Sequence, residues 1–148
     1  MENKSLEFLC KSRTQTYASG KEAENISGFK VYNIKNGNLE YRDAYTDQHY
    51  YFQGQETMFQ DGKPIWSMSY RGAAEEGADT GKVFGFLQKI LKEHSDVVRL
   101  PDNKEFTDGD WRYQDNCDGK VEEFNGLEEI YQNGKLVHWM KYFGGEIK

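Results

Sequence analysis

Apolar residues recur along this chain with two different spacings, and the spacing changes from segment to segment. Residues 4–13 and 82–94 carry them at every third or fourth position, which is typical of an amphipathic helix. Asn3 before the first segment, and Asp79 or Thr80 before the second, are suitable N-caps. The pattern therefore predicts two helices, the first followed by an exposed loop over residues 21–28. The apolar stripe of the second helix consists of Val83, Leu87, Ile90, Leu91 and His94.

Apolar and polar residues alternate in most of the remaining chain, which is typical of half-buried strands. Turn signals stand at Asn36-Gly37, where both residues of a type I′ turn would have positive φ, and at Asp61-Gly62. A third turn is predicted at Asn133-Gly134, and Phe106 opens a short strand before Asp108-Gly109. The alternation predicts two antiparallel meanders, with strands over residues 29–34, 39–46, 49–60 and 63–71 and then over 111–116, 121–132 and 136–143.

The stretch from residue 37 to 72 is repeated without a gap from residue 109 to 144. Two copies indicate an internal duplication rather than a solenoid, which needs at least three stacked units. Each half reads as a helix followed by a meander. We therefore predict one α+β domain over residues 1–148, a curved antiparallel sheet with two helices on one face. The matched pairs include Tyr41 with Tyr113, Asp43 with Asp115, Gly54 with Gly126, Glu56 with Glu128, Met68 with Met140 and Tyr70 with Tyr142.

Charge and composition narrow the classes of function. The net charge of −6 provides no basic field to attract nucleic acid and disfavours an anionic membrane surface. The N-terminal sequence MENKSLEF has no apolar segment of a signal peptide, and no apolar run is long enough to span a bilayer. We interpret Cys10 and Cys117 as free thiols, which indicates a cytoplasmic protein. His49, His94 and His138 have no metal-ligand spacing, and no motif indicates a cofactor.

The repeated polar residues are the candidate site. Strand parity places Tyr41 and Asp43 on one face of their strand and Glu56 on the same face of the next. Tyr and Trp rings beside carboxylates suit a cationic or polar small molecule. The structural alternative is that the aromatics pack the sheet and that tyrosines, backbone groups or basic residues satisfy the carboxylates. The candidate ligand-binding set is Tyr41, Asp43, Glu56, Trp66, Tyr70, Tyr113, Asp115, Glu128 and Tyr142.

These motifs resemble a bacterial family known as domain of unknown function 5680. The resemblance covers nearly the whole chain. It implies a stand-alone protein or the C-terminal part of a helix-turn-helix regulator, and hence a ligand-sensing or interaction module, with no catalytic residues to carry over. The motifs that carry it are Tyr41-Arg42-Asp43, Phe52-x-Gly54-Gln55-Glu56, Gly62-Lys63-Pro64-x-Trp66-x-Met68-x-Tyr70-x-Gly72, Gly109-Asp110-x-x-Tyr113, Phe124-x-Gly126-x-Glu128 and Gly144-Gly145-x-Ile147-Lys148.

We therefore expect a non-catalytic module that binds a small polar or cationic ligand. One alternative is a protein-interaction domain of the inhibitor or immunity kind, which small size and acidity would fit. A second alternative is a hydrolase that uses Glu56 or Glu128 with a neighbouring carboxylate as acid and base. If it were an enzyme, the first copy would hold the richer site, since Tyr45 there is replaced by Cys117 in the second copy.

Overall fold

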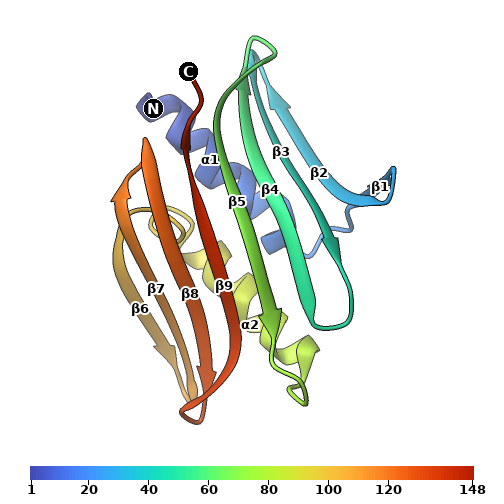
Figure 1. Cartoon of the computed structure of the whole chain (residues 1–148), viewed down its shortest axis with the longest axis vertical. Coiled ribbons are helices and arrows are strands. Elements are labelled where there is room, and N and C mark those ends of the chain that lie inside the picture. Colours follow the sequence, from blue (N-terminus) through green and yellow to red (C-terminus); the bar gives the residue numbers. More distant parts are fainter.

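A computed structural model describes all residues from 1 to 148. Nine strands form one antiparallel sheet in the order β1-β2-β3-β4-β5-β9-β8-β7-β6, and two helices accompany it, which makes an α+β fold (Figure 1). The elements are α1 (Asn3–Gln15), a short 3-10 helix (Tyr17–Ser19), β1 (Glu24–Ile26), β2 (Phe29–Asn36), β3 (Leu39–Asp47), β4 (Tyr51–Gln60), β5 (Lys63–Ala74), α2 (Thr80–Glu93), β6 (Asp102–Asp108), β7 (Trp111–Lys120), β8 (Glu123–Gln132) and β9 (Lys135–Glu146).

The last strands of the two meanders, β5 and β9, pair at the middle of the sheet (Figure 1). Tyr70 lies directly opposite Tyr142 in this pair. The register shifts once in each half, between Met58 and Phe59 and between Ile130 and Tyr131, and these positions are 72 residues apart in sequence. Equivalent strand pairs are therefore bent at equivalent places.

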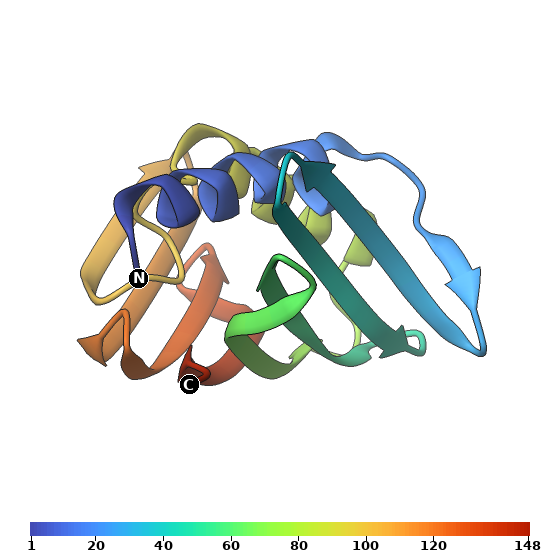
Figure 2. The same cartoon turned by 90° about the horizontal axis from the view of Figure 1, so that it is seen from above.

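The sheet is curved, and Figure 2 shows both helices lying over its concave side. Under α1 the core contains Phe8 and Leu9 together with Met58, Met68 and Tyr142 from the strands. In a second cluster the apolar stripe of α2 packs against residues of β7, β8 and β9. Its residues include Val83, Phe86, Leu87, Ile90, Leu91, Tyr113 and Ile130. Neither helix is long and apolar enough to cross a membrane.

The helix ends differ in part from the sequence expectation. Glu2, not Asn3, precedes α1, and its side chain makes no capping hydrogen bond. The cap of α2 is Asp79, whose carboxylate accepts a hydrogen bond from the backbone N–H of Lys82, as predicted. The expected loop over residues 21–28 contains the short strand β1, which pairs with β2.

Turn and strand details also correct the expectation. The first hairpin turn is centred on Gly37 and Asn38, one residue later than predicted, and Gly37 takes the positive φ of 62°. Asp61 and Gly62 both have positive φ, as a type I′ turn requires. Strand β6 starts at Asp102, so Phe106 lies inside it instead of opening it. Strict alternation would put Pro64 on the same face as Trp66, but the bulge in β5 places Pro64 opposite Phe59 and away from that face.

Candidate ligand-binding site

The four repeated carboxylates lie on the concave side of the sheet, beneath the helices. Asp43 is opposite Glu56 across β3 and β4, and Asp115 is opposite Glu128 across β7 and β8. All four are buried, with exposed fractions of 8, 2, 0 and 0% in that order. Buried carboxylates need partners, because an isolated charge loses its hydration on burial. Their partners therefore decide what each carboxylate can do.

Glu56 forms a buried ion pair with Arg13 of α1. Arg13 donates from Nε to Oε2 at 2.9 Å and from Nη2 to Oε1 at 3.0 Å, and Tyr41 donates its hydroxyl to Oε2 at 2.6 Å. Burial alone would raise the pKa of Glu56, but Arg13 and Tyr41 hold it below the ordinary value. Glu56 is therefore a charged residue whose two oxygens are both occupied.

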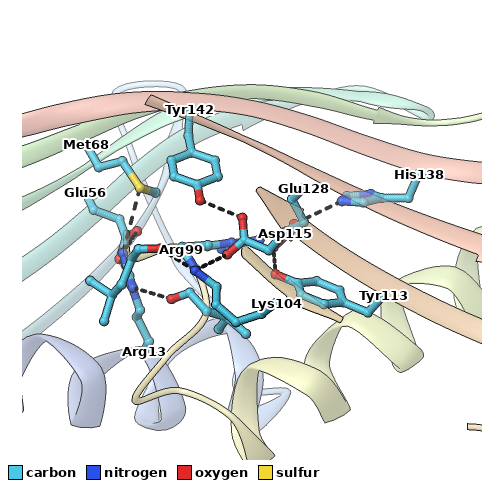
Figure 3. A network of polar contacts seen from close by, with 12 residues as sticks. Arg13, Glu56, Met68, Arg99, Lys104, Tyr113, Asp115, Glu128, His138 and Tyr142 are labelled. Carbon is cyan, nitrogen blue, oxygen red and sulfur yellow. Dashed lines mark hydrogen bonds and ion pairs between the residues drawn. The ribbon is translucent and has the colours of Figure 1, made fainter. Parts of the chain in front are cut away.

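Glu128 has the same kind of partners in the second half (Figure 3). Arg99 donates from Nε and Nη2 to its two oxygens, both at 2.9 Å, and Tyr113 donates its hydroxyl at 2.5 Å. Nε2 of His138 lies 3.2 Å from Oε1. These contacts overcome the effect of burial and hold the pKa of Glu128 well below its ordinary value. Arg99 comes from the loop after α2, so the two arginines are not equivalent in sequence.

Each aspartate accepts a hydrogen bond from a tyrosine two strands away. Tyr70 on β5 reaches over Gly54 on β4 to Oδ1 of Asp43, and the O–O distance is 2.6 Å. Tyr142 reaches Asp115 in the same way at 2.6 Å, passing over Gly126. A methyl group at Gly54 would lie 2.6 Å from the Tyr70 hydroxyl, which is closer than van der Waals contact permits. The repeated glycines thus leave the path that the tyrosines need.

The two aspartates differ in their remaining partners. Asp115 also accepts a hydrogen bond from the backbone N–H of Arg99 at 2.7 Å, and Nζ of Lys104 lies 3.2 Å from its Oδ2. Arg99 has a positive φ of 56°, the left-handed backbone that residues other than glycine seldom adopt. Asp43 has only the hydrogen bond from Tyr70. The second-half carboxylate is thus fully partnered, whereas the first is not.

The surroundings of Asp43 favour its neutral form. Burial and the neighbouring carboxylate of Glu56 raise the pKa of Asp43 to about 7 from an ordinary 3.8, and the Tyr70 hydrogen bond only partly opposes this. Burial and Glu128 also raise the pKa of Asp115, while Tyr142 and Lys104 oppose the rise. A cation beside Asp43 would favour its charged form.

A cavity of about 340 Å³ lies beside Asp43, between the first half of the sheet and helix α2. Four of the predicted site residues line it, namely Tyr41, Asp43, Glu56 and Tyr70. Further wall residues are Tyr17, Tyr45, Phe52, Phe84, Leu87 and Arg99.

The other predicted site residues lie away from this cavity. Trp66 is fully buried, stacks on Phe124 and donates its indole N–H to the carbonyl oxygen of Val121. The remaining four belong to the second half and join the hydrogen-bonded cluster around Arg99 (Figure 3). They are Tyr113, Asp115, Glu128 and Tyr142.

No group of three or more His, Cys, Asp or Glu side chains could hold a metal ion.

Sequence reasoning allowed for tyrosine and basic partners of the carboxylates but did not identify the basic residues. Arg13 follows Leu6 and Leu9 at helical spacing, so its place on the buried side of α1 was a usable signal. Arg99 and Lys104 stand outside the repeated stretches and outside any periodic helix, and no local pattern indicates their role.

Comparison with known proteins gives a family. The model of a family described as a domain of unknown function (DUF5680) matches residues 43–147. The matched stretch contains both Asp–Glu pairs, whereas α1, which supplies Arg13, precedes it. Neither the curated proteins nor the solved structures include a match to the chain. Because the family match covers well over half of the sequence, this chain belongs to the domain of unknown function 5680 family.

Proposed function

We propose that this protein is a non-catalytic module that binds a small ligand in the cavity beside Asp43. The observation that carries the proposal is the difference between the two aspartates. Asp115 is enclosed by Tyr142, Arg99 and Lys104, whereas Asp43 has one hydrogen bond and lines a cavity of about 340 Å³. Small-molecule sites commonly occupy pockets of about 300 to 1,000 Å³ with a few polar groups among apolar walls.

The charges around the cavity favour a cationic group. Arg13 neutralises Glu56, and Arg99 is committed to Glu128 through Nε and Nη2. Asp47 at the rim has its own partner, Lys30, at 2.9 Å. Asp43 is therefore the carboxylate without a basic side chain, and a bound cation would stabilise its charged form.

The aromatic walls support the same ligand class. Tyr45, Phe52 and Phe84 are among the aromatic residues that line the cavity. Phe52 stands 6.1 Å from both Tyr70 and Phe84, measured between ring centroids. Such rings attract a positive charge through their quadrupoles and shield apolar parts of a ligand from water.

We also propose that the two halves arose by duplication and then diverged in role. The equivalent bulges, the equivalent Asp–Glu pairs and the opposed Tyr70 and Tyr142 support a common origin. With both helices on the concave side, the second half forms a closed ionic core and the first half provides the cavity.

Cys10 and Cys117 are free thiols, which supports a reducing, cytoplasmic location.

The carboxylate contacts weigh against the hydrolase alternative. Both oxygens of Glu56 and of Glu128 accept hydrogen bonds from an arginine, so neither glutamate is available as a nucleophile or base. Asp43 then stands without a second free carboxylate, and a glycosidase-type pair requires two.

Protein interaction stays a second candidate because of the face opposite the helices. Phe143 is 65% exposed there, and Arg42 lies over the ring of Phe59 at 5.2 Å. Affinity capture with a Phe143→Ser variant as control tests this candidate. A stoichiometric partner that the variant loses would support it.

Thermal shift and NMR with a metabolite library test the ligand proposal. The library contains cationic, neutral and anionic compounds, and the variant is Asp43→Asn, with Asp118→Asn as the control on an exposed strand position. We expect binding to perturb resonances of cavity residues such as Phe84, and Asp43→Asn to weaken it. Occupancy at one hundred times Kd would stabilise the fold by about 2.7 kcal/mol. The proposal is wrong if no charge class perturbs the cavity.

A further inference from the structure

Lys104 shows what the aspartate of the second half accepts. It lies on β6 directly opposite Asp115, and its side chain is 11% exposed. Besides lying 3.2 Å from Asp115, its ammonium group donates hydrogen bonds to the carbonyl oxygens of Leu100 and, at 2.8 Å, of Asp102. The chain thus places a primary ammonium group, carried on an alkyl stem, against this carboxylate.

The equivalent position in the first half is Tyr32. It lies on β2 directly opposite Asp43, 72 residues before Lys104. Its hydroxyl donates to the carbonyl oxygen of Lys21, and its ring stacks on Tyr45 with a centroid distance of 6.4 Å. Tyr32 therefore supplies no positive charge to Asp43. Where the second half has the Lys104 ammonium group, the first half has a cavity that Asp43 lines.

We propose that the ligand is a primary alkylammonium compound, whose ammonium group takes at Asp43 the place that Lys104 takes at Asp115. This inference rests on the proposed function and names the class of ligand. The ammonium ion would pair with Asp43, and its alkyl portion would lie among Tyr45, Phe52 and Leu87.

Hydrogen bonding separates this class from other cations. Lys104 donates hydrogen bonds to acceptors as well as carrying a charge, and a quaternary ammonium ion has no N–H to donate. An alcohol of the same length can donate one hydrogen bond but brings no charge to Asp43. An alkyl carboxylate brings a negative charge, which would disfavour the charged form of Asp43 instead of pairing with it.

Binding of four hexyl compounds to the wild-type protein tests the class. The compounds are n-hexylammonium, trimethylhexylammonium, 1-hexanol and hexanoate, measured by titration calorimetry at one ionic strength. We expect n-hexylammonium to bind with one-to-one stoichiometry and at least tenfold more tightly than the other three. If 1-hexanol or trimethylhexylammonium binds as tightly as n-hexylammonium, the ammonium inference is wrong, although a cavity ligand is still supported. If no compound here or in the metabolite library binds, both proposals are wrong.

Substitution of Tyr32 by lysine gives an independent test. Tyr32→Lys should bring an internal ammonium group to Asp43 and reduce n-hexylammonium binding at least tenfold. Should this variant fail to fold by circular dichroism, Asp43→Asn serves instead and should show the same loss.

Lys104→Ala removes the internal ammonium group from Asp115. We expect a lower Tm for this variant, and we expect n-propylammonium chloride to raise its Tm more than sodium chloride or 1-propanol at equal concentration. Equal effects of the three additives would show that the site at Asp115 does not select a primary ammonium group, and the analogy on which the inference depends would fail.

Discussion

Replacement of Arg13 by methionine measures how much the buried Arg13–Glu56 ion pair beneath α1 contributes to stability. Both side chains are almost completely buried, at 4 and 3% exposure, and two hydrogen bonds join them. Methionine retains most of the apolar volume of the arginine stem but removes the charge. Glu56 would keep only its hydrogen bond from Tyr41. Removal of one partner from a buried ion pair typically costs about 3 to 5 kcal/mol.

Protonation of Glu56 sets a limit to this cost. A carboxyl group with an ordinary pKa of 4.5 can be neutralised at pH 7 for about 3.4 kcal/mol, because each pKa unit corresponds to about 1.4 kcal/mol. We therefore expect Arg13→Met to lose about 3 kcal/mol of unfolding free energy at pH 7. At pH 5 protonation is cheap, so most of the deficit should disappear.

The pH dependence of this variant differs in sign from that of the native ion pair. In the wild-type protein the pKa of Glu56 is lowered, so its contribution to stability is complete above the unfolded value and is lost as the pH falls. In Arg13→Met the pKa of Glu56 is raised by burial, so stability increases as the pH falls toward 5. Urea unfolding followed by circular dichroism between pH 5 and 8 measures the slope of the variant, with the wild-type protein, in which the contribution of Glu56 is complete over this range, as the reference.

Two further variants serve as controls. Glu56→Gln alone leaves Arg13 buried without its counter-ion, and because arginine does not lose its proton the deficit should persist at every pH in this range. Arg13→Met with Glu56→Gln removes both charges and should recover stability to within about 1.5 kcal/mol of the wild-type protein. A deficit below about 1 kcal/mol for Arg13→Met at pH 7, or one that does not shrink at pH 5, would refute this account of the ion pair.

Two other predictions concern the repeated glycine and Asp43. Gly126→Ala should destabilise the protein by about 2 kcal/mol or more, because its methyl group would lie 2.2 Å from the Tyr142 ring, whereas Gly85→Ala, with open space in α2, should stabilise it by up to about 1 kcal/mol. Chemical denaturation compares the two, and equal effects would contradict the steric argument. Because the pKa of Asp43 is raised to about 7, its contribution to stability falls as the pH rises from about 4 to 7, by at most about 1.4 kcal/mol per pH unit. Asp43→Asn should remove that slope, and an unchanged slope would assign it to another group.

Strand periodicity predicted the positions of the carboxylates but not their partners. Alternation assigns the residues of each strand to its two faces, and a short turn such as Asp61-Gly62 fixes the register of the strands that it joins, β4 and β5. Asp43 and Glu56 lie on one face because they pair directly across β3 and β4. Arg13 meets Glu56 from 43 positions away, through the packing of a helix on the sheet. No local pattern encodes such a contact, so the ionic core required the structure.

The cause of the difference between the two aspartates was not predicted, for a different reason. The gapless repeat begins at residue 37, so the exchange of Tyr32 for Lys104 lies just outside it. Inside the repeat the Asp43 and Asp115 positions look alike. Their difference comes from neighbouring strands β2 and β6 and from the loop that carries Arg99. Two similar sets of residues therefore form one enclosed ionic cluster and one cavity.

The unequal origin of the two arginines bears on the fidelity of folding. Two similar stretches in one chain invite mispairing, in which a strand of one half takes the place of its counterpart in the other. Backbone hydrogen bonds and apolar faces would tolerate that exchange, since both halves share them. Arg13 reaches its glutamate from a helix and Arg99 from a loop, 86 residues later. Because these arginines belong to neither repeat, a glutamate from either half would still meet one of them after an exchange. Lys104 differs, because β6 in the place of β2 would take it away from Asp115 and leave that buried carboxylate without its cation, so we expect this lysine to oppose mispairing.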